Sequence, residues 1–93
     1  DNFALAYWEL GRYEEGLNAA RRLVAAQPTY FVGYAYIAMN AMSLGRLDEA
    51  REAIVEGRRV RSDFSLALVQ NYFGVSRPEI DARRNEALQQ AGL

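Results

Sequence analysis

A motif that occurs twice constrains the fold of this chain more than any other feature of its sequence. Residues 10–15 read LGRYEE and residues 44–49 read LGRLDE, so the copies lie 34 residues apart, and the two positions of six that differ are chemically similar. A period of this length is typical of a helical hairpin that is copied along a solenoid, because one hairpin cannot bury its apolar face without a neighbour. The duplication therefore predicts an all-α fold of stacked hairpins.

Apolar residues at helical spacing, separated by turn residues, predict where the helices of the two copies lie. Gly11 and Gly45 each interrupt the apolar pattern inside a copy, and Gln27-Pro28 separates the first copy from the second. We therefore expect four helices, over residues 1–10, 13–26, 31–44 and 47–61.

After residue 62 the period decays, and the remaining residues predict a different kind of helix pair. Ser65 is a candidate N-cap for a short helix over residues 66–72, and Gly74-Val75 predicts a turn. Ser76 and Glu79 form a capping box for a last helix that continues to about residue 91. This helix has an apolar and a polar side, as a solenoid cap should. The apolar side comprises Ile80, Ala87, Leu88 and Ala91, and the polar side largely Arg83, Glu86, Gln89 and Gln90.

The residues at corresponding places of the two copies follow a size pattern. They are Phe3, Ala4, Tyr7, Gly16, Ala20 and Pro28 in the first copy, and Tyr34, Ile37, Ala38, Ala41, Ala50, Ile54 and Ser62 in the second. This pattern resembles the tetratricopeptide repeat, a helix-turn-helix unit with the signature W-x2-L-G-x2-Y, A-x3-F and P. The resemblance implies one repeat over residues 1–28, whose first turn is missing, a second over residues 29–62, and C-terminal capping helices over residues 63–93, all in one domain.

Three departures from the tetratricopeptide signature weaken the second copy. Ser62 replaces the closing Pro, and Ala41 replaces an aromatic residue. Gly57 falls inside the fourth helix, where it costs about 1 kcal/mol relative to Ala. We expect the second repeat to be looser than the first.

The tail of the chain carries a second resemblance. The residues from Asp63-Phe64-Ser65-Leu66 through Arg77-Pro78-Glu79 to Ala91-Gly92-Leu93 resemble the end of bacterial tetratricopeptide proteins that carry an N-terminal class III adenylate/guanylate cyclase or a winged-helix regulator. This resemblance implies a part of a larger bacterial signalling protein. Because Asp1 is not an initiator Met, we expect the chain to be a C-terminal fragment.

A second apolar stripe runs along the first helix of each hairpin, beside the stripe that packs on the partner helix. The tetratricopeptide resemblance implies that this second face lines a concave groove for an apolar or helical protein segment, with Met for adaptable packing and Trp8 as an anchor. The alternative is that further repeats or the C-terminal cap cover these side chains. The candidate groove residues are Leu5, Trp8, Val32, Ala35, Tyr36, Met39 and Met42.

The composition of the chain argues against several classes of function. A net charge of −1 and a pI of about 5.4 disfavour nucleic acid as a partner. The absence of His and Cys removes the commonest general base and the softest nucleophile, so we expect neither catalysis nor a cofactor. Asp48, Glu49 and Glu52 lie on one predicted helix and point apart, so we expect no metal site. No stretch resembles a signal peptide or a membrane span, which favours a cytoplasmic protein.

Two further clusters each have two interpretations. Tyr30, Phe31, Tyr34 and Tyr36 are either core packing between repeats or a stacking platform for bases, and packing is favoured. The arginines at positions 58, 59 and 61 either complement a helix C-terminus, which is favoured, or bind phosphate. The groove lacks the Lys, Arg and Asn with which family members clamp a chaperone's carboxylate, so we do not expect that ligand.

The sequence therefore predicts a non-catalytic scaffold that binds a protein or peptide segment. Two alternatives remain open: the chain is the regulatory tail of a nucleotide cyclase, or it forms a homodimer through an exposed first helix.

Overall fold

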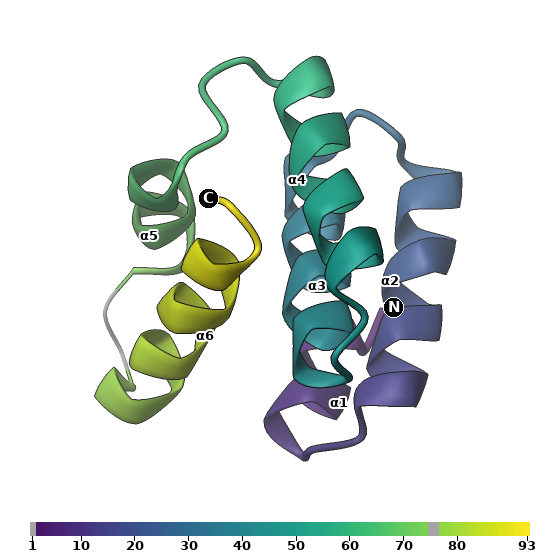
Figure 1. Ribbon diagram of the computed structural model, residues 1–93, viewed down its shortest axis with the longest axis vertical. Coiled ribbons are helices and arrows are strands. Elements are labelled where there is room, and N and C mark those ends of the chain that lie inside the picture. Colours follow the sequence, from purple (N-terminus) through teal and green to yellow (C-terminus); the bar gives the residue numbers. More distant parts are fainter. Residues whose placement is uncertain (1, 75–76) are drawn as a thin grey trace.

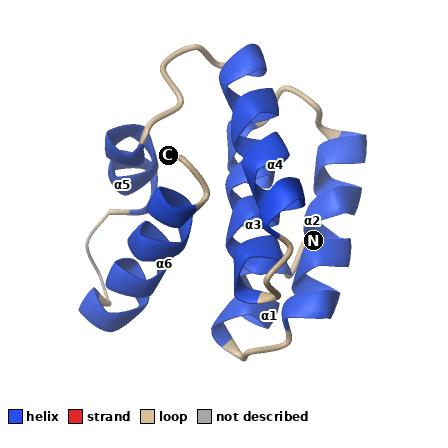
Figure 2. Ribbon diagram, in the orientation of Figure 1, coloured by secondary structure: helices blue, strands red, loops and turns tan. Residues whose placement is uncertain are grey.

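The computed structural model describes residues 2–74 and 77–93, which form six α-helices and no strand (Figures 1 and 2). The expected all-α class is confirmed. None of these helices has the length and apolarity that crossing a bilayer requires. The helices are α1 (Ala4–Glu9), α2 (Tyr13–Ala26), α3 (Phe31–Ser43), α4 (Leu47–Val60), α5 (Leu66–Phe73) and α6 (Pro78–Gln90).

The two copies of the repeated motif have the same backbone geometry at the turn between their helices. Gly11 and Gly45 have φ angles of 77° and 76°, in the left-handed region that favours glycine. The next amide donates to the carbonyl five residues back, over 2.8 Å at Arg12 and 2.9 Å at Arg46. α2 and α4 begin 34 positions apart and contain 14 residues each. The hairpin α1–α2 is therefore repeated as α3–α4.

The first helix is shorter than expected, because Asn2 holds the chain outside it. Oδ1 of Asn2 accepts a hydrogen bond from the amide of Ala4 over 2.9 Å, and its Nδ2 donates to the carbonyl of Ala19 over 2.6 Å. α1 therefore starts only at Ala4, against α2.

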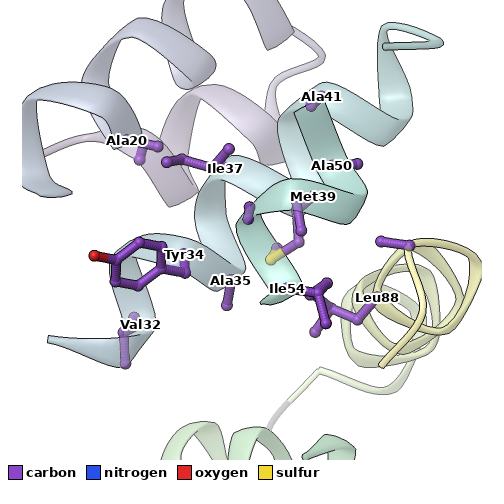
Figure 3. Close-up of a cluster of buried hydrophobic side chains, with 14 of the residues drawn as sticks. Ala20, Val32, Tyr34, Ala35, Ile37, Met39, Ala41, Ala50, Ile54 and Leu88 are labelled. Atoms are coloured by element: carbon purple, nitrogen blue, oxygen red, sulfur yellow. The ribbon is translucent and has the colours of Figure 1, made fainter. Parts of the chain in front are cut away.

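α3 is the central helix and packs against α2, α4, α6 and, less extensively, α1. The crossing with α2 is close: a Cβ placed on Gly16 would lie 2.7 Å from Cγ of Asn40, so only glycine permits it. Figure 3 shows Ile37 of α3 beside Ala20 on this side. Elsewhere in the same core, Met39 comes together with buried residues of the other helices, Ile54 and Leu88 (Figure 3).

The C-terminal helices do not continue the repeat. α5 has eight residues and is capped as expected by Ser65, whose Oγ accepts a hydrogen bond from the amide of Leu68 over 3.2 Å. Figure 1 shows α5 and α6 on one side of the α3–α4 pair and α2 on the other. The extents of 29, 26 and 25 Å are nearly equal, because α6 folds back onto α3. Val75 and Ser76, assigned to the predicted turn and capping box, lie outside the described residues.

Candidate binding groove

The candidate groove residues lie on α1 and α3, as expected, but most of them are covered. Trp8, Val32, Ala35 and Met39 are at most 1 % exposed, and the other three, Leu5, Tyr36 and Met42, are partly buried. Because α6 and α5 pack onto this side, the expectation of an open apolar groove is wrong for the described chain. The alternative, that the C-terminal helices cover these side chains, describes the structure. Whether the seven residues bind a partner stays a prediction.

Trp8 connects α1 with both α3 and α6. Its Nε1 donates a hydrogen bond to Oγ of Ser43 over 3.1 Å, and Ser43 in turn donates to the carbonyl of Met39. The guanidinium of Arg83, on α6, lies over the indole at 4.6 Å from the ring centroid. A cation at this distance is attracted to the negative face of the ring. The indole therefore has a polar partner at its edge and a cationic one on its face.

Polar contacts hold both ends of α6. At its N-terminal end, Arg77 forms a bidentate ion pair with Glu9 of α1, with both nitrogen–oxygen distances 2.6 Å. This bond is the main cause that raises the pKa of Arg77. At the C-terminal end, Nη2 of Arg58 on α4 donates to the carbonyl of Gly92 over 3.2 Å. α6 is thus positioned by residues of two different helices.

An ion pair whose arginine is buried lies on α6 beside Phe73 of α5. Arg84 is 4 % exposed, and its Nη1 donates to Oδ1 of Asp81 over 3.2 Å. Arg84 also donates twice to Oδ1 of Asn85 and covers the ring of Phe73 at 5.0 Å. Oδ2 of Asp81 is buried without a hydrogen-bond partner. A buried carboxylate oxygen without a donor is unfavourable, so the covering helix carries an internal cost.

Aromatic rings hold α5 against α3. The rings of Tyr36 and Phe73 lie 6.0 Å apart, and those of Phe31 and Tyr72 lie 5.7 Å apart. The hydroxyls of Tyr30 and Tyr72 are hydrogen-bonded, and burial together with this bond raises the pKa of Tyr30 to about 12. Burial also raises the pKa of Tyr36. The rings fill the α3–α5 interface, as the packing interpretation of the sequence expects.

α6 leaves part of the groove unfilled. A recess of about 200 Å³ remains beside one end of the contact, lined by residues of α1, α2, α3 and α6: Trp8, Tyr13, Met42, Ser43, Arg83, Glu86, Ala87 and Gln90. A smaller recess of about 50 Å³ lies near the start of α6 and is lined by Leu5, Glu9, Phe73, Arg77, Ile80, Asp81 and Arg84. Three of the seven candidate residues, Leu5, Trp8 and Met42, therefore line one of the two recesses.

The surface arginines and acids have local partners. Arg59 and Arg61 bind Glu56 and Asp63, so the arginine run pairs within its own neighbourhood. Of the acids on α4, Glu49 pairs with Arg21 over 2.7 Å. Within the described ranges, no group of three or more acidic, His or Cys side chains is arranged to hold a metal. The charged residues named here therefore pair with opposite charges, both locally and between helices.

Sequence reasoning missed the α6 residues that contact the groove. Arg83 was assigned to the polar side, yet it lies four positions before Ala87 and borders the buried face. Arg84 lies four positions after Ile80 and four before Leu88, in the centre of the apolar stripe. An arginine in the middle of an apolar stripe indicates a buried contact in which the guanidinium has a partner, and here that partner is the ring of Phe73.

Comparison of the chain with known protein families, with characterised proteins and with solved structures finds no match.

Proposed function

We propose that this chain is a non-catalytic protein–protein interaction module of the tetratricopeptide type, which binds a helical segment of a protein partner along α1 and α3. The observation that carries the proposal is the position of α6, an amphipathic helix that lies along α3 and contacts Trp8 and Glu9 of α1. A surface that accommodates a helix of its own chain has the shape and the side chains to accommodate one from another chain.

The repeated hairpin supports the tetratricopeptide assignment. The two turns share their glycine geometry, and small residues at the helix crossings, such as Gly16 and Ala50, are buried. We extend the proposal to a docking or regulatory role in a larger bacterial signalling protein of the cytoplasm, with a class III cyclase or a winged-helix regulator as the upstream domain. This extension rests on the resemblance carried by residues 63–93.

The test compares a groove residue with a matched residue on another face. Helical peptides are selected by display on the purified chain, and their affinities are measured by fluorescence polarisation for the wild type, Met42→Glu and Val55→Glu. Met42 borders the recess beside Trp8, whereas Val55 is 63 % exposed on α4. We expect Met42→Glu to weaken binding by about tenfold or more and Val55→Glu to leave it unchanged. Equal loss in both variants contradicts the proposal.

Self-association is a second candidate function, because Phe3 of the first hairpin is exposed whereas the residue at the same place of the second hairpin is buried. Phe3 corresponds to Ile37 one period later; Phe3 is 56 % exposed, and Ile37 is 9 % exposed. A second copy of the chain could cover Phe3 as α2 covers Ile37. Light scattering at several concentrations on the wild type and Phe3→Glu tests this candidate: a concentration-dependent dimer that the substitution abolishes supports it, and a monomer in both contradicts it.

A further inference from the structure

We infer that α6 is a built-in competitor for the partner: the partner is an amphipathic helix with the contact chemistry of α6, and it binds only when α6 has left α1 and α3. This inference rests on the proposed function and adds to it the chemistry of the partner and the regulation of the groove. Four properties of the α6 contact carry it.

The first property is that the fit of α6 is incomplete. The recess beside Trp8 and Met42 and the recess beside Leu5 both lie along the seam between α6 and the first helices of the hairpins. A natural core packs to high density with few voids larger than a water molecule. A helix that fills either recess would therefore make contacts that α6 does not make.

The second property is the buried charge in the α6 contact. Arg84 is buried, its partner Asp81 is 16 % exposed, and one buried carboxylate oxygen of Asp81 has no donor. Replacing a buried ion pair with apolar residues of similar volume is often neutral or stabilising. A partner helix with apolar residues at the registers of Asp81 and Arg84 would meet Leu5 and Phe73 without that unfavourable oxygen.

The third property is that the contacts of α6 are mainly with α3 and not with α5, the helix that precedes it. α6 packs more extensively on α3 than on α5, while α5 has its own aromatic contacts with α3. α6 can therefore leave while α5 stays in place. The ion pair between Arg77, at the start of α6, and Glu9 adds little to the stability of this contact, because the side chain of Arg77 is 58 % exposed and exposed ion pairs contribute little to stability.

The fourth property is the polarity of the groove, which fixes the direction and chemistry of its occupant. Glu9 lies at the end that holds the start of α6, the indole of Trp8 lies at mid-length, and Arg58 lies at the end that holds the last carbonyls. The matching helix carries a basic residue at its start and an Arg over Trp8. It then has small or leucine side chains four, five and eight positions after that Arg, as at Ala87, Leu88 and Ala91.

Competition within one chain has a predictable size. A tethered segment acts at an effective concentration on the order of 1 mM, so if the α6 sequence itself binds the open groove with a Kd of about 10 μM, any competing free helix binds the closed chain about 100-fold more weakly. The wild type should therefore bind a free helix poorly. Variants that loosen α6 should bind the free helix more tightly than the wild type, and variants that hold α6 more firmly should bind it more weakly.

The experiment uses the intact chain and three variants. Leu88→Asp places a charge in the buried contact and opens the groove. Arg77→Glu/Arg83→Glu changes no buried residue of α6 and opens the groove by repulsion, because it places carboxylates beside Glu9 and the negative face of Trp8. Asp81→Leu/Arg84→Met replaces the buried pair and closes the groove more firmly. Far-UV circular dichroism checks that each variant keeps most of the helix content of the wild type, as it must if α2, α3 and α4 stay folded. Trp8 is the only tryptophan, so its emission wavelength reports directly on the cover of the groove.

The probe is a fluorescein-labelled synthetic peptide of residues 77–93. We expect red-shifted Trp8 emission and at least about tenfold tighter peptide binding in both opening variants, and weaker binding than wild type in the closing variant. A peptide with Leu in place of Asp81 and Met in place of Arg84 should bind the open chain more tightly than the natural one, and a peptide with Ala in place of Arg83 more weakly.

The outcomes separate this inference from the proposed function. If the peptide binds the wild type and all variants equally, α6 does not compete and the inference is wrong, while recognition of helices stands. If neither the peptide nor any display-selected helix binds an opened chain whose Trp8 is exposed, the inference and the proposed function both fall. If opening the groove instead produces a dimer that excludes the peptide, the occupant is a second copy, and the assignment to a partner helix is overturned.

Discussion

The ring of Phe64 lies directly on the backbone of α4 at Gly57. A Cβ atom placed on Gly57 would lie 2.5 Å from Cδ2 of that ring and 3.3 Å from Cβ of Tyr34. Phe64 is 2 % exposed, and its ring also packs against Phe31 with the ring centroids 5.8 Å apart. The contact of Phe64 with α4 therefore fixes the segment between α4 and α5, and it is possible only because residue 57 is glycine.

Gly57→Ala should destabilise the chain, although alanine is the better helix former. The helix propensity of Ala favours the substitution by about 1 kcal/mol, but overpacking against Phe64 costs about 1–3 kcal/mol and the ring cannot move without uncovering Phe31. Urea unfolding followed by circular dichroism measures the difference in the free energy of unfolding.

The matched control is Gly57→Ala/Phe64→Leu, in which a smaller side chain leaves room for the new methyl group. We expect the double variant to lose less stability than the sum of its two single substitutions. A Gly57→Ala variant that is more stable than the wild type would show that the Phe64 ring does not limit this position.

Sequence reasoning located the helices of the repeat well, because the helical period and the turn residues are local signals. α2 was predicted with its observed bounds, and α3 and α4 end one residue earlier than expected. Gly57 appeared only as a cost to helix stability, since the residue that occupies the space of its missing side chain lies beyond the repeat. A contact with Phe64 has no periodicity to reveal it.

The state of the groove was not predictable from the stripe that forms it. An apolar stripe such as the one containing Trp8 and Met39 has the same sequence pattern whether a partner or the chain itself covers it. Which of the two covers it depends on the path of the chain after residue 61. α6 supplies the cover with its apolar side, Ala87, Leu88 and Ala91, and with two arginines. That apolar side is predictable from the sequence and allowed the cap to be named as a possible cover, and the register of Arg84 between Ile80 and Leu88 was a further sign of a buried contact.

Gly16 and Asn40 should be coupled in a double-mutant cycle. Gly16→Ala places a methyl group within 2.7 Å of Cγ of Asn40 and should cost about 1–3 kcal/mol. Asn40→Ala loses the 2.9 Å hydrogen bond to the carbonyl of Tyr36, but it also removes a buried amide oxygen that has no partner and makes space for the methyl group. We expect the double variant to be more stable than additivity predicts by about 0.5–3 kcal/mol, as measured by urea unfolding. Strict additivity would contradict the close crossing of α2 and α3.

Ser65→Ala should weaken the start of α5. The substitution removes the hydroxyl that accepts a hydrogen bond from the amide of Leu68, and loss of such a cap costs about 1 kcal/mol. Hydrogen exchange should therefore increase at the amides of α5 more than at those of α2. Ser65→Asp, which restores an acceptor at the cap, is the control and should recover most of the protection. Equal exchange in the alanine variant and the wild type would show that the cap does not hold the helix.

The tyrosine pair between α3 and α5 should make stability fall in alkaline solution. Burial first, and then the hydrogen bond to Tyr72, raise the pKa of Tyr30 from its ordinary value of 10.0 to about 12, and burial raises the pKa of Tyr36 in the same direction. The folded chain therefore keeps a proton that the unfolded chain releases. The resulting contribution is fully present below about pH 10, decreases as the pH rises toward 12, and is lost above it.

Tyr72→Phe keeps the ring that packs on Phe31 and removes the hydroxyl that bonds Tyr30. The pKa of Tyr30 should then be raised less, so the free energy of unfolding should fall less steeply between pH 10 and 12 than in the wild type. The chain contains no lysine, so tyrosines are the side chains that titrate in this window. Urea unfolding at pH 8, 10 and 11.5 measures the slope, and an identical slope in both proteins would show that the hydrogen bond between the two hydroxyls does not contribute to it.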